Sequence, residues 1–162
     1  MPDFEPGDKA VYPGHGVAEV KGRETRDLAG FATEGYLLQA LGKDMTLFLP
    51  IQNVGRVGLR RLVDDEQVEE VYKVLRRRDE KISTATWNRR HREYMEKIKT
   101  GSLVQIAAVL RDLCILRSGK ELSYGEKNML ETARNLLVQE LALAKDRGED
   151  DIAQEIDQLF DA

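Results

Sequence analysis

Residues 7–20 read Gly7-Asp8-Lys9-Ala10-Val11-Tyr12-Pro13-Gly14-His15-Gly16-Val17-Ala18-Glu19-Val20, and this stretch decides the fold of the first part of the chain. Residues 9–12 are rich in strand-forming side chains, and apolar alternation resumes at residues 17–20. Residues 13–16 combine a proline with two glycines, a composition that favours a tight turn. The stretch therefore predicts two short strands joined by a turn.

A second hairpin is predicted further along the chain. Residues 35–41 and 45–49 are mostly apolar, and they flank Gly42-Lys43-Asp44, a typical turn sequence. All four prolines and nine of the 13 glycines lie before residue 61, so the whole first segment is rich in turns. Short strands at this spacing predict a small curled sheet or barrel of SH3 or Tudor size. We expect such a barrel to leave one strand edge open.

The sequence changes character near Leu62, and from there the apolar residues follow helical spacing. Glu126 lies three residues after Ser123, which is the pattern of a capping box. Residues 152–160 predict a last short helix, and residues 79–85 predict a break. We therefore expect an α+β protein, with a small SH3- or Tudor-like barrel in residues 1–62 and a compact all-α domain of about five helices in residues 63–162. The helix caps that we predict are Asp64 or Asp65, Thr86, Ser102 and Ser123.

Charge is distributed unevenly along the chain. The formal net charge of -4 argues against a protein that binds nucleic acid or anionic membranes through a diffuse positive field. Residues 73–99, however, hold ten basic and four acidic side chains, whereas residues 140–162 hold two basic and eight acidic ones. Any contact with nucleic acid should therefore be local and directional.

Several functional classes find no support in the sequence. Cys114 is the only cysteine, so it has no partner for a disulfide within the chain, and with only His15 and His91 as histidines a zinc site is not credible. Motifs for catalysis and phosphate binding are absent, which favours a protein that is not an enzyme and needs no cofactor. The N-terminal residues do not resemble a secretion signal, and no apolar run approaches the ~20 residues of a membrane helix. We expect a cytoplasmic protein.

Trp87 is the only tryptophan, and it lies inside the basic segment. On a helix it would share a face with His91, Tyr94 and Ile98, which favours an ordinary core position. It also falls in the first predicted turn, where a side chain can overhang the core. The flanking cations are typical of an aromatic side chain that inserts into distorted DNA or stacks on an unpaired base. Both interpretations remain open on the sequence. The cations in question are Arg89, Arg90, Arg92, Lys97 and Lys99.

Three motifs, in this order along the chain, resemble the CarD/CdnL family of bacterial transcription factors, and more closely its CdnL type. The resemblance implies a Tudor-like domain that binds the β subunit of RNA polymerase by pairing strands with it. It also implies a helical domain that contacts promoter DNA at the upstream edge of the melted bubble and stabilises the open complex of the holoenzyme with the primary sigma factor. The motifs are Gly7-Asp8-Lys9-Ala10-Val11-Tyr12-Pro13-Gly14-His15-Gly16-Val17, Thr86-Trp87-Asn88-Arg89-Arg90 and Leu122-Ser123-Tyr124-Gly125-Glu126-Lys127.

The resemblance, together with the basic segment, predicts two sets of site residues in a monomeric, nucleoid-associated protein. One departure from the family concerns Phe48, because some relatives have arginine there and an apolar contact would replace a salt bridge. For RNA polymerase we predict contacts from Arg26, Leu38, Phe48 and Pro50. For DNA we predict contacts from Trp87, Arg89, Arg90, Arg92, Lys97 and Lys127.

Two other classes of function compete with this interpretation. One is a protein–protein adaptor whose barrel binds a peptide, whose helices bind a second protein and whose Trp87 lies in the core. The other is an RNA-binding module. Binding to forked promoter DNA that depends on salt and occurs only with polymerase would distinguish the transcription factor from both.

Overall fold

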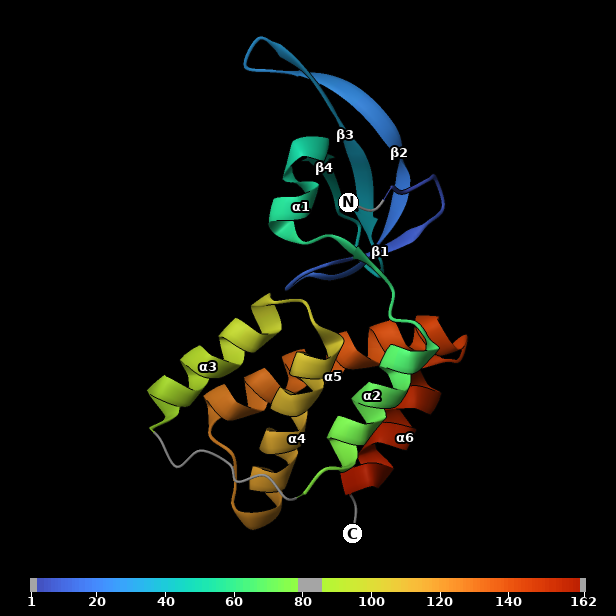
Figure 1. The fold of residues 1–162 in the computed structure, drawn as a ribbon. Helices are drawn as coiled ribbons and strands as arrows, with labels where there is room; N and C mark the ends of the chain where they lie inside the picture. Colours follow the sequence, from blue (N-terminus) through green and yellow to red (C-terminus); the bar gives the residue numbers. More distant parts are fainter. Residues whose placement is uncertain (1–2, 79–85, 161–162) are drawn as a thin grey trace. The chain divides into compact units, whose positions relative to one another are not determined.

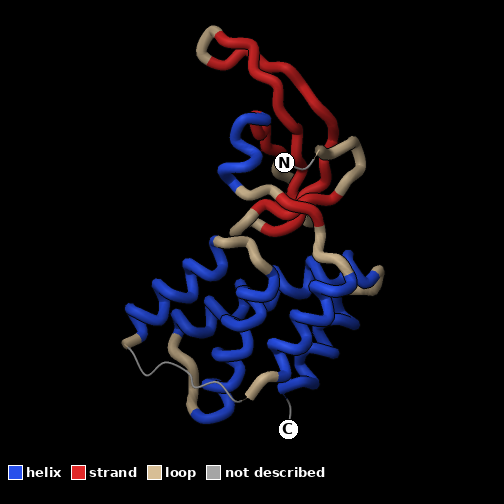
Figure 2. Tube along the Cα trace, in the orientation of Figure 1, coloured by secondary structure: helices blue, strands red, loops and turns tan. Residues whose placement is uncertain are grey.

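The protein is described by a computed structural model that covers residues 3–78 and 86–160. The chain divides into two compact units, Met1–Leu62 and Val63–Ala162. Strands make up most of the first unit, together with one short helical segment, and helices make up the second, as the red and blue tubes of Figure 2 show. The expected α+β class, with a Tudor-like β unit followed by a helical unit, is confirmed.

The first unit is built on one five-stranded antiparallel sheet, with the strands in the order β4-β3-β2-β1-β5. Figure 1 labels the first four of these strands along the chain, β1 to β4. Both predicted hairpins are present, the first as β1 with β2 and the second as β3 with β4. A 3-10 turn, Ile51–Asn53, and the short helix α1, Val54–Val57, lead from β4 to β5. The strands are β1 Lys9–Tyr12, β2 Gly16–Leu28, β3 Phe31–Ala40, β4 Thr46–Pro50 and β5 Arg60–Arg61.

A small apolar core lies on one face of this sheet. Tyr36 is 2% exposed and also ties the N-terminal segment to the sheet, because its hydroxyl accepts hydrogen bonds from the Phe4 backbone N–H at 3.2 Å and from Arg23 at 3.0 Å. The register between β2 and β3 shifts at Val20 and Gly22, which is the signature of a β-bulge and bends the pair. The core consists of Phe4, Ala10, Ala18, Val20, Tyr36, Leu38, Leu49, Val54 and Leu59.

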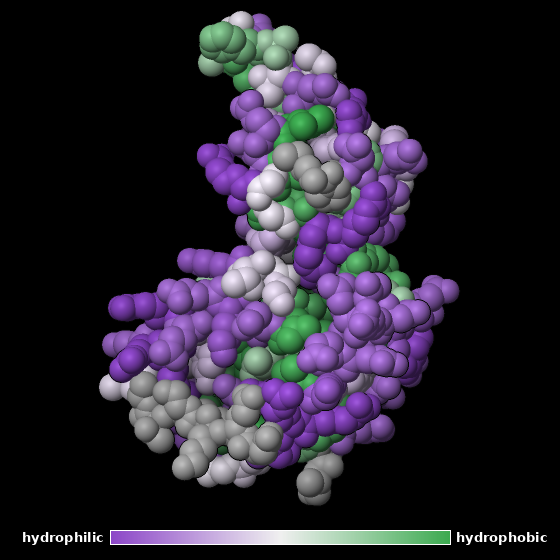
Figure 3. All heavy atoms as spheres, viewed as in Figure 1, coloured by the Kyte–Doolittle hydropathy of each residue, from purple (hydrophilic) through white to green (hydrophobic). Residues whose placement is uncertain are grey.

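The hairpin of β2 and β3 is much longer than the short strands that the sequence predicted, and its far end extends beyond the core (Figure 1). Most residues in this end are exposed on both sides, so no alternating pattern marks them as strand. The turn at the tip uses Ala29 at φ 54° and Gly30 at φ 84°, the two positive values that a type I′ turn requires. Leu28 and Phe31 beside the turn are 42% and 75% exposed, and this tip is green in Figure 3.

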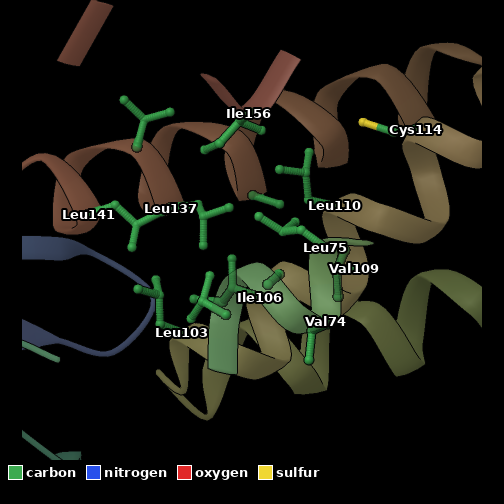
Figure 4. Packing of buried hydrophobic residues seen from close by; sticks show 14 of the residues in the cluster. Val74, Leu75, Leu103, Ile106, Val109, Leu110, Cys114, Leu137, Leu141 and Ile156 are labelled. Atoms are coloured by element: carbon green, nitrogen blue, oxygen red, sulfur yellow. The ribbon is translucent and has the colours of Figure 1, made fainter. Parts of the chain in front are cut away.

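The second unit consists of helices α2 to α6 around an apolar core in which α4 is central. Residues from α2, α4, α5 and α6 converge there, among them Leu75, Leu110, Leu137 and Ile156, each at most 1% exposed (Figure 4). Helix α4 packs against α2, α3 and α5. The helices are α2 Asp65–Arg76, α3 Trp87–Lys99, α4 Leu103–Gly119, α5 Tyr124–Lys145 and α6 Glu149–Phe160.

Three of the four predicted helix caps form side-chain hydrogen bonds, and the cap at Thr86 does not. Asp64 caps α2 in a capping box with Gln67, and Ser102 caps α4 by accepting a hydrogen bond from the Gln105 backbone N–H at 3.3 Å. Ser123 and Glu126 form the predicted capping box of α5. Thr86 occupies the N-cap of α3, as predicted, but its side chain makes no capping hydrogen bond. The break that we predicted at residues 79–85 lies outside the described residues.

Candidate functional site

Strand β4 forms one edge of the sheet in the first unit. Within the described residues it pairs with β3 and with no other strand. The backbone N–H and C=O groups on its other side are therefore available to a strand from another chain, as at other sheet edges. Pro50 ends the strand and cannot donate a hydrogen bond, which limits pairing to the residues before it.

Three of the residues predicted to contact polymerase lie together on the outer face of this edge, opposite the core. Phe48 is the cross-strand neighbour of Leu37, and Pro50 is that of Gly35. The guanidinium of Arg26 lies over the Phe48 ring, 4.8 Å from its centroid. A Cβ atom on Gly35 would lie 2.6 Å from Cζ of Phe48, so the ring packs directly against the bare backbone of β3.

Leu38 does not belong to this face, contrary to the prediction. It is 1% exposed and pairs with Leu47 on the opposite face, where it is part of the core. Successive side chains on a strand point to opposite faces, so a choice that is wrong by one residue reverses the assignment. The neighbouring Leu37 is partly exposed beside Phe48 and is the residue that the sequence reasoning missed. Only the register between β3 and β4, which pairs Leu37 with Phe48, selects it.

In the helical unit, Trp87 is the first residue of α3 and is partly buried. It packs against the apolar core, and its ring makes an edge contact with His91 at a centroid distance of 5.3 Å. The side chain is neither fully enclosed nor free in solvent. The ring therefore rests on the core and still reaches the surface.

Gly125, in the first turn of α5, lies directly against this indole. A Cβ atom on Gly125 would lie 2.9 Å from Nε1 of Trp87 and 3.3 Å from Cε2 and Cζ2. The first value is shorter than Cβ contacts found in folded proteins, so only glycine leaves room for the ring where it is. The start of α5 thus supports the start of α3, and two of the three sequence motifs meet at this point.

Arg90 is buried, so we correct the prediction that it contacts phosphate. The residue is 7% exposed, and its Nη2 lies 3.2 Å from Oε2 of Glu126, which is 2% exposed. Its guanidinium also lies over the Trp87 ring, 5.3 Å from the centroid. Sequence reasoning placed Arg90 on the flank of the helix and recognised Glu126 only as part of a cap. The two residues are 36 positions apart in the chain. No local sequence pattern therefore predicts the ion pair between them.

Glu126 is held in its ionised form by its neighbours. Burial raises the pKa of its carboxyl, but hydrogen bonds from the Ser123 backbone N–H and side chain and from Arg90, with the charge of Lys120 nearby, outweigh burial and lower that pKa to about 2. One carboxyl oxygen accepts the Ser123 backbone N–H at 2.9 Å, while the other faces Arg90. The carboxylate therefore connects the cap of α5 to α3.

The remaining predicted DNA contacts are exposed or partly exposed. Arg89 and Arg92 are exposed on α3, although Arg89 also lies 3.6 Å from Glu93, and Lys97 is partly exposed in the last turn of that helix. Lys127 lies in the first turn of α5, close to Gly125 in sequence, and its side chain is 59% exposed. These cations are accessible from solvent, whereas Arg90 is buried.

Tyr124 was missed as a candidate by the sequence reasoning. It is the first residue of α5, immediately before the glycine that supports Trp87, and it is 81% exposed. By helical spacing Tyr124 lies off the apolar stripe of α5, and an aromatic residue off that stripe was the available signal. Its ring adds exposed apolar surface next to Gly125 in the sequence. We call Gly125, Arg90 and Glu126 together the Trp87 seat.

The described part of the chain contains neither a membrane-spanning helix nor a cluster of metal-binding side chains. None of its helices combines the length and the apolar character needed to cross a membrane. Among residues 3–78 and 86–160, no three or more histidine, cysteine or acidic side chains come together as a metal site would require.

Comparisons with known proteins agree with both units. Residues 4–63 match the family described as the CarD-like/TRCF RID domain, which implies an interaction with RNA polymerase, and residues 70–157 match the CarD C-terminal domain. A Bacillus subtilis (strain 168) protein, YdeB, described as a candidate transcription factor, is 28% identical over 142 residues, which are 88% of this chain and 92% of that protein. A solved structure, CdnLNt from Myxococcus xanthus, is 45% identical and covers 40% of this chain and 92% of its own, with a TM-score of 0.34. The chain belongs to the CarD/CdnL family of bacterial transcription factors.

Proposed function

We propose that the protein binds the β subunit of RNA polymerase through strand β4 and stabilises the promoter open complex formed with the primary sigma factor. In this proposal the helical unit contacts DNA at the upstream edge of the bubble without reading its sequence. The position of Trp87 carries the proposal, because a partly buried aromatic ring at the first residue of a helix, with exposed cations on the same helix, suits insertion at a distorted base step.

The polymerase contact is supported by the open edge of β4 and by its outer face. Strand addition uses backbone hydrogen bonds for affinity and alternate side chains for specificity. Phe48 and Leu37 would supply an apolar surface next to the added strand, and Arg26 would supply a charge above it. Some relatives have arginine where this chain has Phe48. We therefore expect an apolar contact of Phe48 with polymerase instead of a salt bridge.

The DNA contact is supported by the separation of roles among the basic residues. Arg89, Arg92 and Lys127 are exposed and can neutralise phosphates, which positions a protein on DNA without reading the bases. Arg90 serves Trp87 instead. We therefore expect the contribution of the exposed cations to be similar at different promoters and to weaken as salt concentration rises.

The test is the lifetime of open complexes formed by polymerase with the primary sigma factor and challenged with a competitor. We expect Trp87→Ala to bind the β subunit as the wild type does and to shorten this lifetime. Because the ring also packs on the core, Trp87→Leu serves as a second variant that keeps apolar packing and removes the protruding part of the ring. An unchanged lifetime with a folded Trp87→Leu protein would refute the DNA part of the proposal.

A further inference from the structure

We propose that Gly125, Arg90 and Glu126 are positioning residues that hold the Trp87 indole in one orientation before DNA is bound. The inference rests on the proposed function of Trp87 and deepens it. It gives a role to the buried Arg90–Glu126 ion pair and to Gly125. Neither can contact DNA as the exposed basic residues are proposed to do.

Gly125 is the first part of the argument. Its backbone is not in the left-handed region, so glycine is not needed there for its conformation. In the first turn of a helix alanine has a higher intrinsic helix propensity than glycine. The short approach to the indole, 2.9 Å from a Cβ to Nε1, gives the physical reason for glycine at this position. Any larger residue must push the ring away from α5.

The buried ion pair is the second part. The Arg90 guanidinium lies over the indole at 5.3 Å, where the electron-rich face of the ring attracts a cation. Glu126 holds the guanidinium through an ion pair at 3.2 Å, and the capping box with Ser123 holds Glu126 itself. The orientation of the ring is thereby tied to the cap of α5, a rigid element of the fold. The His91 ring also makes an edge contact with the indole, with 5.3 Å between the ring centroids.

A fixed ring binds DNA more tightly than a mobile one. A side chain that already has its bound orientation loses no further conformational freedom when it enters the DNA, whereas a loose ring must be ordered at that step. The contacts with Arg90 and Gly125 also cover part of the indole, so a base cannot enclose it from both sides. The seat therefore favours insertion of the free part of the ring over full stacking between bases.

The experiment compares Gly125→Ala with Gly119→Ala, a matched control in the last position of α4 where a Cβ would meet nothing within 4 Å. Because Trp87 is the only tryptophan, fluorescence excited at a wavelength that tyrosine does not absorb, and its quenching by acrylamide, report on this ring alone. We expect Gly125→Ala to fold with an unchanged melting temperature, to alter the fluorescence, and to shorten the open-complex lifetime about two- to tenfold, the range expected when one side chain must be ordered on binding. Gly119→Ala should match the wild type in all three.

A second variant removes the ion pair without leaving a buried charge. Arg90→Met combined with Glu126→Gln keeps an oxygen for the capping box and replaces the charge over the ring by an apolar chain. We expect greater acrylamide quenching and a shorter lifetime in a folded protein.

The outcomes separate this inference from the proposed function. If Trp87→Leu shortens the lifetime but the seat variants do not, although their fluorescence shows a displaced ring, the positioning role is wrong and the DNA contact stands. Unchanged fluorescence in Gly125→Ala would also overturn the positioning role. If Trp87→Leu itself has no effect on the lifetime, the proposed function fails.

Discussion

Replacing Glu126 by glutamine should destabilise the helical unit by about 3 kcal/mol at neutral pH. The substitution keeps the size of the side chain and an oxygen that can accept the Ser123 backbone N–H, so the cap of α5 survives. It removes the negative charge opposite Arg90, whose guanidinium is then left buried without its counter-ion. Breaking a buried pair in this way typically costs about 3 to 5 kcal/mol.

The pKa of Glu126 gives the magnitude by a second route. Its pKa is lowered from the ordinary value of 4.5 to about 2, and at about 1.4 kcal/mol per pH unit this corresponds to about 3 kcal/mol of stability. Because the folded-state pKa is the lower one, this stability is fully present above pH 4.5 and is lost as the pH falls towards 2. At pH 3, about three fifths of it should be gone from the wild type. The variant has no such group, so the two proteins should converge in acid.

The measurement is urea unfolding of the full chain at several pH values between 7 and 3, followed by the fluorescence of Trp87. This signal reports on the helical unit, where the only tryptophan lies. Glu121→Gln is the matched control, because Glu121 is 89% exposed and its ion pair with Lys127 should contribute little. A stability difference that stays constant from pH 7 to pH 3 would refute the reasoning, since it would show that the charge of Glu126 is not its source.

Three further predictions follow from the two units. Phe48→Asp should abolish pull-down of the polymerase β subunit while leaving urea unfolding of the helical unit unchanged; retained binding would contradict the role of the outer face. Arg89→Gln and Arg92→Gln should each shorten open-complex lifetimes alike at different promoters and reduce the salt slope by about one; a loss confined to one promoter would indicate base reading. Cys114 should resist alkylation in the native protein, because burial raises the pKa of its thiol to about 11; rapid modification would contradict the burial.

The elements that local sequence determines were predicted well. The capping box of Ser123 and Glu126 and the cap at Ser102 each depend on residues three positions apart, and both are present. The hairpin of β3 and β4 was visible because its turn residues and its apolar runs are adjacent. Local patterns also gave the change from strands to helices, since turn residues and helical spacing occupy different parts of the chain.

The candidate site was harder to predict because it depends on which face a side chain occupies and on distant partners. Leu38 and Leu37 are adjacent leucines, and only the register with β4 decides which of them reaches the outer face. Arg90 carries the same charge as its exposed neighbours, and only the fold brings Glu126 to it. The long arms of β2 and β3 have no buried face over most of their length, so they lack the alternation by which a strand is recognised.

The net charge of -4 bears on how the two proposed contacts depend on each other. A chain with this charge gains little from diffuse attraction to DNA, so a few exposed cations and one aromatic ring would bind free promoter DNA weakly. If the first unit binds polymerase, the second meets DNA as part of the same complex, and its effective concentration there can be far higher than that of the free protein. Each contact can then be weak on its own, because both act within one complex. A substitution that disrupts either contact should therefore shorten the open-complex lifetime to the same extent. Phe48→Asp, which leaves the proposed DNA surface unchanged, should shorten that lifetime as severely as a variant of Trp87.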